Sequence, residues 1–169
     1  KCINVESIAE LHKINRVATE LGLRAPISLR VNPDVDAQTH PYISTGLKGN
    51  KFGIAYHEVL KTYREASQLP QIDVVGIDCH IGSQITTTAP YLDALDKVLD
   101  LVEHLKREGI IIHHLDLGGG LGISYGDETP PDITEFTNTL LNRVAERGFG
   151  HLDVVLEPGR SLVGNAGVL

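Results

Sequence analysis

The stretch Ile72-Asp73-Val74-Val75-Gly76-Ile77-Asp78-Cys79 decides the fold, together with the segment that follows it. It is a short apolar run of strand composition, and residues 110–117 form a second run of the same kind. Between the two runs, apolar residues recur every three or four positions, as on one face of a helix: Leu92, Leu95, Leu99, Val102 and Leu105. Strand, helix and strand in this order predict a unit of two parallel strands joined by a crossover helix.

The same alternation extends in both directions along the chain. Further strands are predicted at Ile3–Val5, Ile27–Val31 and Val154–Leu156. Further helices are predicted at residues 8–21, between Ser7 and Gly22 as caps, at 56–67, and around Phe136, Leu140 and Val144 up to Gly148. The polar stretch from Asp34 to Lys51 is predicted to be a loop, and residues 163–169 to begin another element.

The near-continuous apolar strands predict a parallel sheet that is covered on both faces. Two α/β architectures fit this pattern, a doubly wound open sheet and part of a (β/α)8 barrel. A complete barrel needs about 250 residues, so a chain of 169 residues holds only five or six of the eight units. We expect a single domain, because the sequence has no low-complexity segment or linker.

Composition excludes several functional classes. There are 22 acidic and 15 basic residues, for a net charge of −7, which argues against a nucleic-acid partner. No apolar run approaches the roughly 18 residues of a membrane span, and the first residues lack the apolar core of a secretory signal. Cys2 and Cys79 form no CxxC pair, which favours a reducing, cytoplasmic setting. The eight histidines show no metal-ligand spacing, so no metal is expected.

Four predicted strands end in residues that can carry chemistry. These strand ends are Arg30-Val31-Asn32-Pro33-Asp34, His80-Ile81-Gly82-Ser83-Gln84, Asp116-Leu117-Gly118-Gly119-Gly120-Leu121-Gly122 and Glu157-Pro158-Gly159-Arg160. Because the carboxyl ends of parallel strands lie at one edge of the sheet, these segments converge where such folds bind their ligands.

The run Gly118-Gly119-Gly120 has two interpretations. Its uncovered amides could hold a phosphate, or the glycines could serve only a tight turn with positive φ. The dinucleotide fingerprint fails, because Ile123 stands where its third glycine should be, and no P-loop is present.

The single side chains leave similar alternatives. His80 is either a structural histidine or a site residue, and Ser83 either binds a phosphate or caps its own loop. Glu157 is expected to end a buried strand, where a carboxylate needs compensation. It could form an ion pair with Arg160, or it could hold a ring nitrogen protonated while Arg160 meets an anion.

Taken together, the motifs resemble the alanine-racemase-like, pyridoxal-phosphate-dependent amino-acid decarboxylases. The resemblance runs over nearly the whole chain and includes Lys51-Phe52-Gly53 besides the four strand ends. Within the family, residues 80–84 and the loop with Ser44-Thr45-Gly46 are most similar to the branch that converts meso-2,6-diaminopimelate to L-lysine. The family fold implies part of a TIM-type (β/α)8 barrel over residues 1–169.

The resemblance also implies roles for the residues. His80 would stack on the pyridine ring, Glu157 would pair with its nitrogen, and Arg30 would lie near it. The cofactor phosphate would be held by Ser83 and the amides of Gly118, Gly119 and Gly120. Arg160, in the segment with Pro158 and Gly159, would contact the phosphate side and a substrate carboxylate. Lys51 would lie near a subunit interface, since the family implies a homodimer.

Some parts of the family pattern are missing from this sequence. Members bind the cofactor through a lysine on an early barrel strand, and they use a cysteine and a tyrosine from a C-terminal β domain across the dimer. Neither part is found here, so we expect this span alone to be inactive. The alternatives are a decarboxylase of the ornithine or arginine type, a non-catalytic homologue that acts as a binding protein, and an unrelated α/β protein that binds a nucleotide phosphate.

Overall fold

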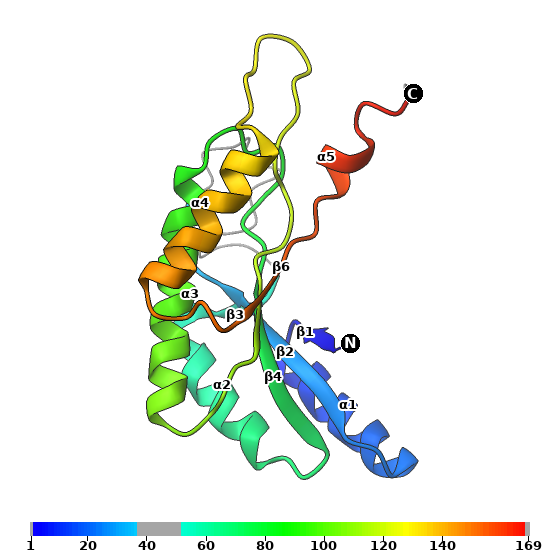
Figure 1. Ribbon diagram of the computed structural model, residues 1–169. Helices are drawn as coiled ribbons and strands as arrows, with labels where there is room; N and C mark the ends of the chain where they lie inside the picture. Colours follow the sequence, from blue (N-terminus) through cyan, green and yellow to red (C-terminus); the bar gives the residue numbers. More distant parts are fainter. Residues whose placement is uncertain (1, 37–51, 168–169) are drawn as a thin grey trace.

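The computed structural model describes residues 2–36 and 52–167, which form one parallel sheet with helices (Figure 1). The strands are β1 (Ile3–Val5), β2 (Ala25–Asn32), β3 (Ile54–Ala55), β4 (Ile72–Cys79), β5 (His114–Asp116) and β6 (Asp153–Val155). The helices are α1 (Ile8–Leu21), α2 (Tyr56–Gln68), α3 (Ala89–Arg107), α4 (Ile133–Glu146) and α5 (Gly159–Val163). The predicted alternation of strands and helices is therefore confirmed.

The strand order decides between the two predicted architectures. Neighbouring strands follow the order β1-β2-β4-β5-β6, all pairs are parallel, and the two-residue β3 joins the end of β2. In a doubly wound sheet the order would reverse at a switch point. A steadily increasing order is that of a (β/α)8 barrel, so the described chain forms an arc of such a barrel.

The ends of α1 show how local sequence sets the elements. Ser7 is the N-cap and its hydroxyl accepts the amide of Glu10 at 3.2 Å, while the Glu10 carboxylate accepts the amide of Glu6 at 2.7 Å. Gly22 ends the helix in the left-handed conformation, with φ of 65°. These caps fix where the chain turns back into β2.

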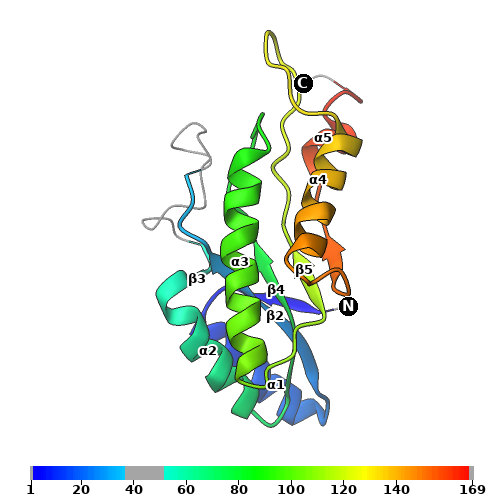
Figure 2. The same cartoon turned by 60° about the vertical axis from the view of Figure 1, so that its left-hand side comes forward.

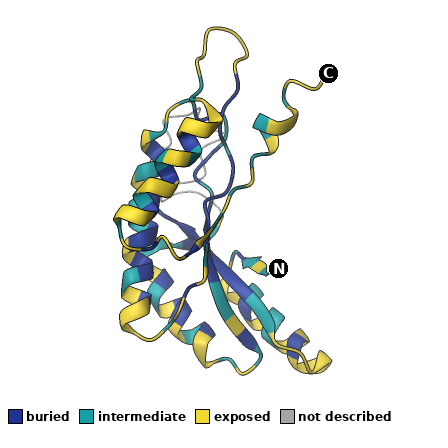
Figure 3. Ribbon diagram, in the orientation of Figure 1, coloured by how far each residue is buried: buried dark blue, intermediate teal, exposed yellow. Residues whose placement is uncertain are grey.

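All four long helices pack on one face of the sheet. Leu29 of β2, Ile77 of β4 and Leu115 of β5 point to this face, and all three are fully buried in a single apolar cluster with the helices. Figures 1 and 2 show α2, α3 and α4 side by side along the strands, and in Figure 3 their buried residues face the sheet. Helices on one face only are a second mark of a barrel arc.

The opposite face, which we call the inner face, is polar, and this corrects one expectation. Alternation along β2, β4 and β5 places Ser28, Asp78 and Asp116 there, and their residues are 0%, 4% and 7% exposed. The sequence predicted strands covered on both faces because their runs are nearly continuous and apolar; these inner-face residues are buried but polar. The predicted run Ile110–Ile112 precedes β5 instead of forming it, and Ile111 is 53% exposed.

A close approach across the inner face depends on one glycine. Gly76 of β4 is the register partner of His114 of β5, and a Cβ at position 76 would lie 2.2 Å from the imidazole Nε2. The ring therefore lies across β4 and brings Nε2 to 3.4 Å from the sulfur of Cys2. A glycine in a strand interior often marks such an approach.

The C-terminal elements differ from the sequence prediction in two ways. Residues 159–163 form α5, whereas an element was predicted to begin only at Val163. The strand before Glu157 is not buried: Val155 is 40% exposed, because among the described strands β6 has β5 as its single neighbour. In the described ranges no helix is long and apolar enough to cross a membrane.

Candidate active site

The glycine run forms a turn that has no space for side chains. A Cβ at Gly118 would lie 2.6 Å from the Cys79 carbonyl oxygen, and one at Gly119 would lie 2.2 Å from the Glu157 carbonyl oxygen. A Cβ at Gly120 would lie 2.1 Å from the Gly82 carbonyl oxygen. Gly118 and Gly120 also have positive φ, of 64° and 100°. The turn is therefore wedged between the ends of β4 and β6.

The amides of this turn have different partners, which narrows the predicted phosphate site. The Gly118 amide donates to Asp116 Oδ1 at 3.0 Å, and the Gly119 amide donates to His80 Nδ1 at 3.2 Å. Within the described ranges, no hydrogen bond from the Gly120 amide to a protein acceptor is found. Of the three amides, only that of Gly120 is left to bind an anion, and the other two shape the turn.

His80 is held as a neutral imidazole at the end of β4. Because Nδ1 accepts the Gly119 amide, the ring proton is on Nε2. Burial lowers the pKa of His80, and the positive charge of Arg30 lowers it further, while Asp116 opposes the shift. This shift favours the uncharged form of the side chain at neutral pH.

Glu157 and Arg160 do not form the ion pair that was one interpretation of the sequence. Arg160 Nη2 donates to Ser83 Oγ at 3.0 Å, and Nη1 donates to the hydroxyl of Tyr125. Among residues 2–36 and 52–167, no ion pair involves Glu157. Its amide donates to the Gly118 carbonyl oxygen at 2.8 Å, so the turn lies directly between Glu157 and His80.

The charges around Glu157 come from the inner face. Burial raises the pKa of Glu157 and Asp116 raises it further, while Arg30 lowers it. Arg30 is itself paired with Glu6, at 2.5 Å between Nη1 and Oε1, and its guanidinium lies 5.3 Å from the ring centre of Phe52. Since Arg30 acts on both His80 and Glu157, the structure brings these three predicted residues to one edge of the sheet.

One atom at this edge is left unsatisfied. Arg160 Nε is buried and has no hydrogen-bond partner among residues 2–36 and 52–167. A buried donor without an acceptor is costly, and such an atom often marks a place for a missing ligand. It lies on the side chain that holds Ser83, so this corner has a free cationic donor for an anion.

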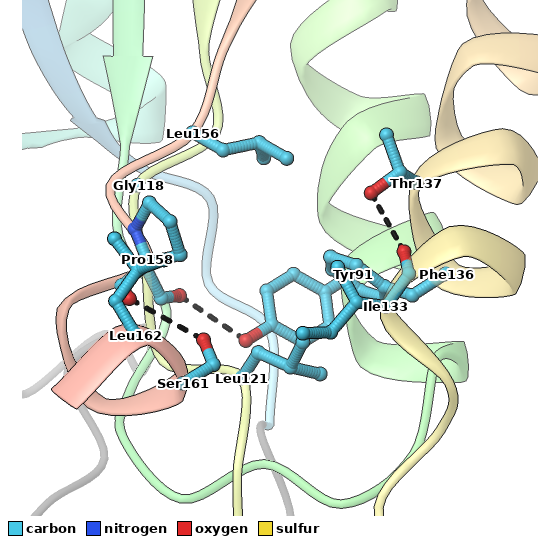
Figure 4. Close-up of a pocket in the computed structure, with 11 residues that line it drawn as sticks. Tyr91, Gly118, Leu121, Ile133, Phe136, Thr137, Leu156, Pro158, Ser161 and Leu162 are labelled. Atoms are coloured by element: carbon cyan, nitrogen blue, oxygen red, sulfur yellow. Dashed lines mark hydrogen bonds between the residues drawn. The ribbon is translucent and has the colours of Figure 1, made fainter. Parts of the chain in front are cut away.

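Behind the glycine turn, on the helix side, lies a small apolar pocket of about 90 Å³ (Figure 4). Tyr91 and Phe136 meet edge to face there, with 4.8 Å between ring centres. The Tyr91 hydroxyl donates to the Gly119 carbonyl oxygen at 3.1 Å, drawn as a dashed line in Figure 4. None of the residues that line this pocket is Lys, Arg or His. The pocket packs against the turn on the helix side, so it is not the anion site.

Three supporting residues had no predicted role. Asp116 was quoted with the glycine run, but no sequence signal assigns its carboxylate to the Gly118 amide. Gln84 spans to Ile123, with Nε2 donating to its carbonyl oxygen at 2.6 Å and Oε1 accepting its amide. Tyr91 is distant in sequence. All three are fixed by tertiary contacts, which spacing along the chain does not show.

Two predictions cannot be compared with the structure. Lys51 and Ser44-Thr45-Gly46 lie outside the described residues.

Within the residues that are described, no group of three or more His, Cys, Asp or Glu could hold a metal ion.

The fold and the site together match a known class of protein. Residues 1–164 match the family of pyridoxal-dependent decarboxylases, in its pyridoxal binding domain, and the chain belongs to this family. The predicted family and the partial barrel are therefore confirmed.

Particular relatives within this class share one name. Diaminopimelate decarboxylase of Haemophilus influenzae is 56% identical and that of Vibrio cholerae 57% identical, over 100% of this chain and 40% of each relative. The crystal structure of diaminopimelate decarboxylase from Helicobacter pylori, complexed with L-lysine, superposes with a TM-score of 0.89 at 40% identity. That match covers 95% of this chain and 40% of the other, so the chain spans about two-fifths of these proteins.

Proposed function

We propose that the protein containing this chain is a diaminopimelate decarboxylase, which uses pyridoxal 5′-phosphate to convert meso-2,6-diaminopimelate to L-lysine. The observation that carries the proposal is the glycine turn between His80 and Glu157, which has no room for a Cβ at any of its three positions. The substrate follows from relatives of that name, which are 56% and 57% identical over the whole chain.

The residues present fit the cofactor. The unpartnered Arg160 Nε, the Ser83 hydroxyl and the amide of Gly120 are donors suited to a phosphate. The His80 imidazole, held beside the turn by the Gly119 amide, suits stacking on an aromatic ring. Glu157 supplies the single carboxylate that a pyridinium nitrogen requires.

Each residue then has a defined task. When bound, the cofactor supplies an electron-withdrawing ring that accepts the electron pair left at Cα after loss of carbon dioxide. Glu157 would keep a proton on the ring nitrogen by charge pairing. His80 would stack on the ring, and the Gly119 amide would keep it in place by fixing Nδ1.

Arg160 and Arg30 would interact with the negatively charged groups of the site. The planar guanidinium of Arg160 can bind a phosphate or a carboxylate through two donors. Pro158 and Gly159, which precede Arg160, would belong to the same cofactor-binding segment. Arg30, held by Glu6, would stay near the ring and keep the pKa of Glu157 from rising further.

The organisation of the whole protein forms part of the proposal. Residues 1–169 would be one incomplete cofactor-binding barrel domain, and a lysine on an earlier strand and residues of a C-terminal β domain would complete the site. We propose a cytoplasmic homodimer, as the family resemblance implies. The isolated span would then release no carbon dioxide.

The test is cofactor binding and product formation by the full-length protein. We expect saturable binding of pyridoxal 5′-phosphate, weakened about tenfold or more in Glu157→Ala, and carbon dioxide release from meso-2,6-diaminopimelate. Glu103→Ala, on the exposed surface of α3, is the matched control and should bind like the parent. Turnover of ornithine or arginine instead would change the substrate, and equal binding by Glu157→Ala would contradict the role of Glu157. Absence of any turnover would favour the non-catalytic homologue.

A further inference from the structure

A chain of hydrogen bonds crosses the inner face and ends at the glycine turn. Ser28 Oγ donates to Asn4 Oδ1 at 2.7 Å, and Asn4 Nδ2 donates to Asp116 Oδ2 at 3.3 Å. The other oxygen of Asp116 accepts the amide of Gly118 at 3.0 Å. The chain thus connects β1 to β5 over the two strands between them.

Asp116 occupies the central position in this chain. The residue is 7% exposed, and its two carboxylate oxygens each accept one hydrogen bond, one from Asn4 and one from Gly118. A buried carboxylate with both oxygens bonded holds its donors in a fixed orientation, because releasing either one leaves a buried group unpaired.

The Gly118 amide connects Asp116 to the candidate site. Gly118 has φ of 64°, and the next amide along, that of Gly119, donates to His80. Asp116 therefore fixes the first peptide of the turn, and the turn carries the Gly120 amide, which is the one left to bind the cofactor phosphate. A carboxylate would repel a phosphate, so Asp116 cannot help by direct contact and must act through the turn.

A second carboxyl lies next to Asp116 on the inner face but makes different contacts. Asp78 of β4 is its register partner, and no donor among the described residues bonds to it. Burial raises the pKa of Asp78 to about 7, and Asp116 raises it while Arg30 lowers it. Two donors bond to Asp116, and among the described residues none bonds to Asp78. The charged or titratable groups coupled to this pair include Arg30, Glu6, Glu157, His80, His114, Cys2, Cys79 and Tyr63.

We propose that Asp116 is a positioning residue for the cofactor phosphate: through Gly118 it ties the glycine turn to Asn4 and Ser28 on the inner face. This inference rests on the proposed function, since it concerns the same site, and it adds a residue that touches neither cofactor nor substrate. It predicts that the contribution of Asp116 depends on its hydrogen bonds and is seen mainly in binding of the phosphate group.

The experiment is a swap of donor and acceptor in the full-length protein. Asp116→Asn keeps the acceptor for Gly118 but turns an amide toward the amide of Asn4, so two donors face each other. Asn4→Asp combined with Asp116→Asn restores the pairing with the roles exchanged, and the carboxylate introduced at position 4 can still accept from Ser28. Asp78→Asn is the matched control, since it makes the same chemical change on the next strand with no contact to the turn.

Two ligands make the readout specific. Pyridoxal 5′-phosphate and pyridoxal, which lacks the phosphate, are titrated into each apoprotein. Asp116→Asn should weaken binding of the phosphate form about tenfold and of pyridoxal less than about twofold. The double variant should recover phosphate-form binding to within about threefold, and Asp78→Asn should match the parent.

Each outcome decides the inference. Unchanged phosphate-form binding by Asp116→Asn overturns it and leaves the proposed function intact. Equal loss for both ligands also overturns it, because it shows general damage to the fold, and so does a double variant as weak as the single one. If the parent itself fails to bind pyridoxal 5′-phosphate, the proposed function fails as well.

Discussion

The two faces of the sheet are built from alternate residues of the same strands, but they use different physics. On the helix face, Leu115 and its neighbours are held by contacts within an apolar cluster. On the inner face, Asp116 is held by directed hydrogen bonds. One face contributes stability through buried area, and the other places donors and charges with little apolar burial. The site depends on both.

The largest expected effect is on the helix face. Leu115→Ala should lower the free energy of unfolding by about 2–5 kcal/mol, because Leu115 is fully buried and its loss leaves a cavity. Urea denaturation of the full-length protein measures this change. Leu141→Ala, at a leucine that is 44% exposed, is the control and should change the free energy by less than about 1 kcal/mol. Similar losses for both would contradict the assigned core.

The next effect concerns the boundary between the faces. Gly119→Ala should destabilise the protein by about 1–3 kcal/mol and abolish cofactor binding, since the new Cβ would lie 2.2 Å from a backbone oxygen of Glu157. Thermal unfolding and cofactor titration measure the two losses. Gly150→Ala adds a Cβ at an ordinary 3.5 Å contact and should affect neither. If Gly119→Ala bound the cofactor with the Kd of the parent, the turn would not be part of the cofactor site.

A pH effect is expected from the inner face alone. The pKa of Asp78 is about 7 in the fold, above its ordinary value, so between about pH 4 and 7 the folded state binds more protons than the unfolded state. This contribution to stability is present at low pH and is lost as pH rises, by up to about 1.4 kcal/mol per pH unit. Asp78→Asn should flatten this part of the stability curve, measured by urea denaturation from pH 4.5 to 7.5. A curve as steep as that of the parent would exclude Asp78 as its source.

The smallest expected effect is on stability, when the hydrogen-bond chain loses its far end at Ser28. Ser28→Ala should cost about 1 kcal/mol, since Asn4 Oδ1 loses a buried donor at 2.7 Å. Ser67→Ala, in an exposed helical serine, should stay within about 0.5 kcal/mol of the parent in the same unfolding assay. A loss at Ser28 no greater than at Ser67 would mean that the inner-face chain carries no stability.

Sequence periodicity was sufficient for the helix face and insufficient for the inner face. The limits of α1 and β4 follow from caps and apolar spacing, because these signals are local. The bounds of β5 were wrong, since Ile110–Ile112 is apolar without being paired in the sheet. The two residues of β3 are too few to give a pattern.

The site was predictable as a set of strand ends but not as a network. Parallel topology alone brings the ends carrying His80, Glu157 and Arg160 to one edge. The partners of Arg160 are Ser83, 77 residues away, and Tyr125, 35 residues away, and neither follows from spacing. The expected burial of the strand before Glu157 was wrong for the same reason, because burial depends on neighbouring strands.

The close packing of the His114 ring against Gly76 predicts that substitutions at these two positions are linked within the family. A strand with glycine in its interior gives up intrinsic strand propensity, and here that loss makes room for an imidazole to reach Cys2. Position 76 should therefore accept alanine or a larger residue only in relatives where position 114 has become smaller. Comparing these two alignment columns across species would show whether the sites evolved in concert.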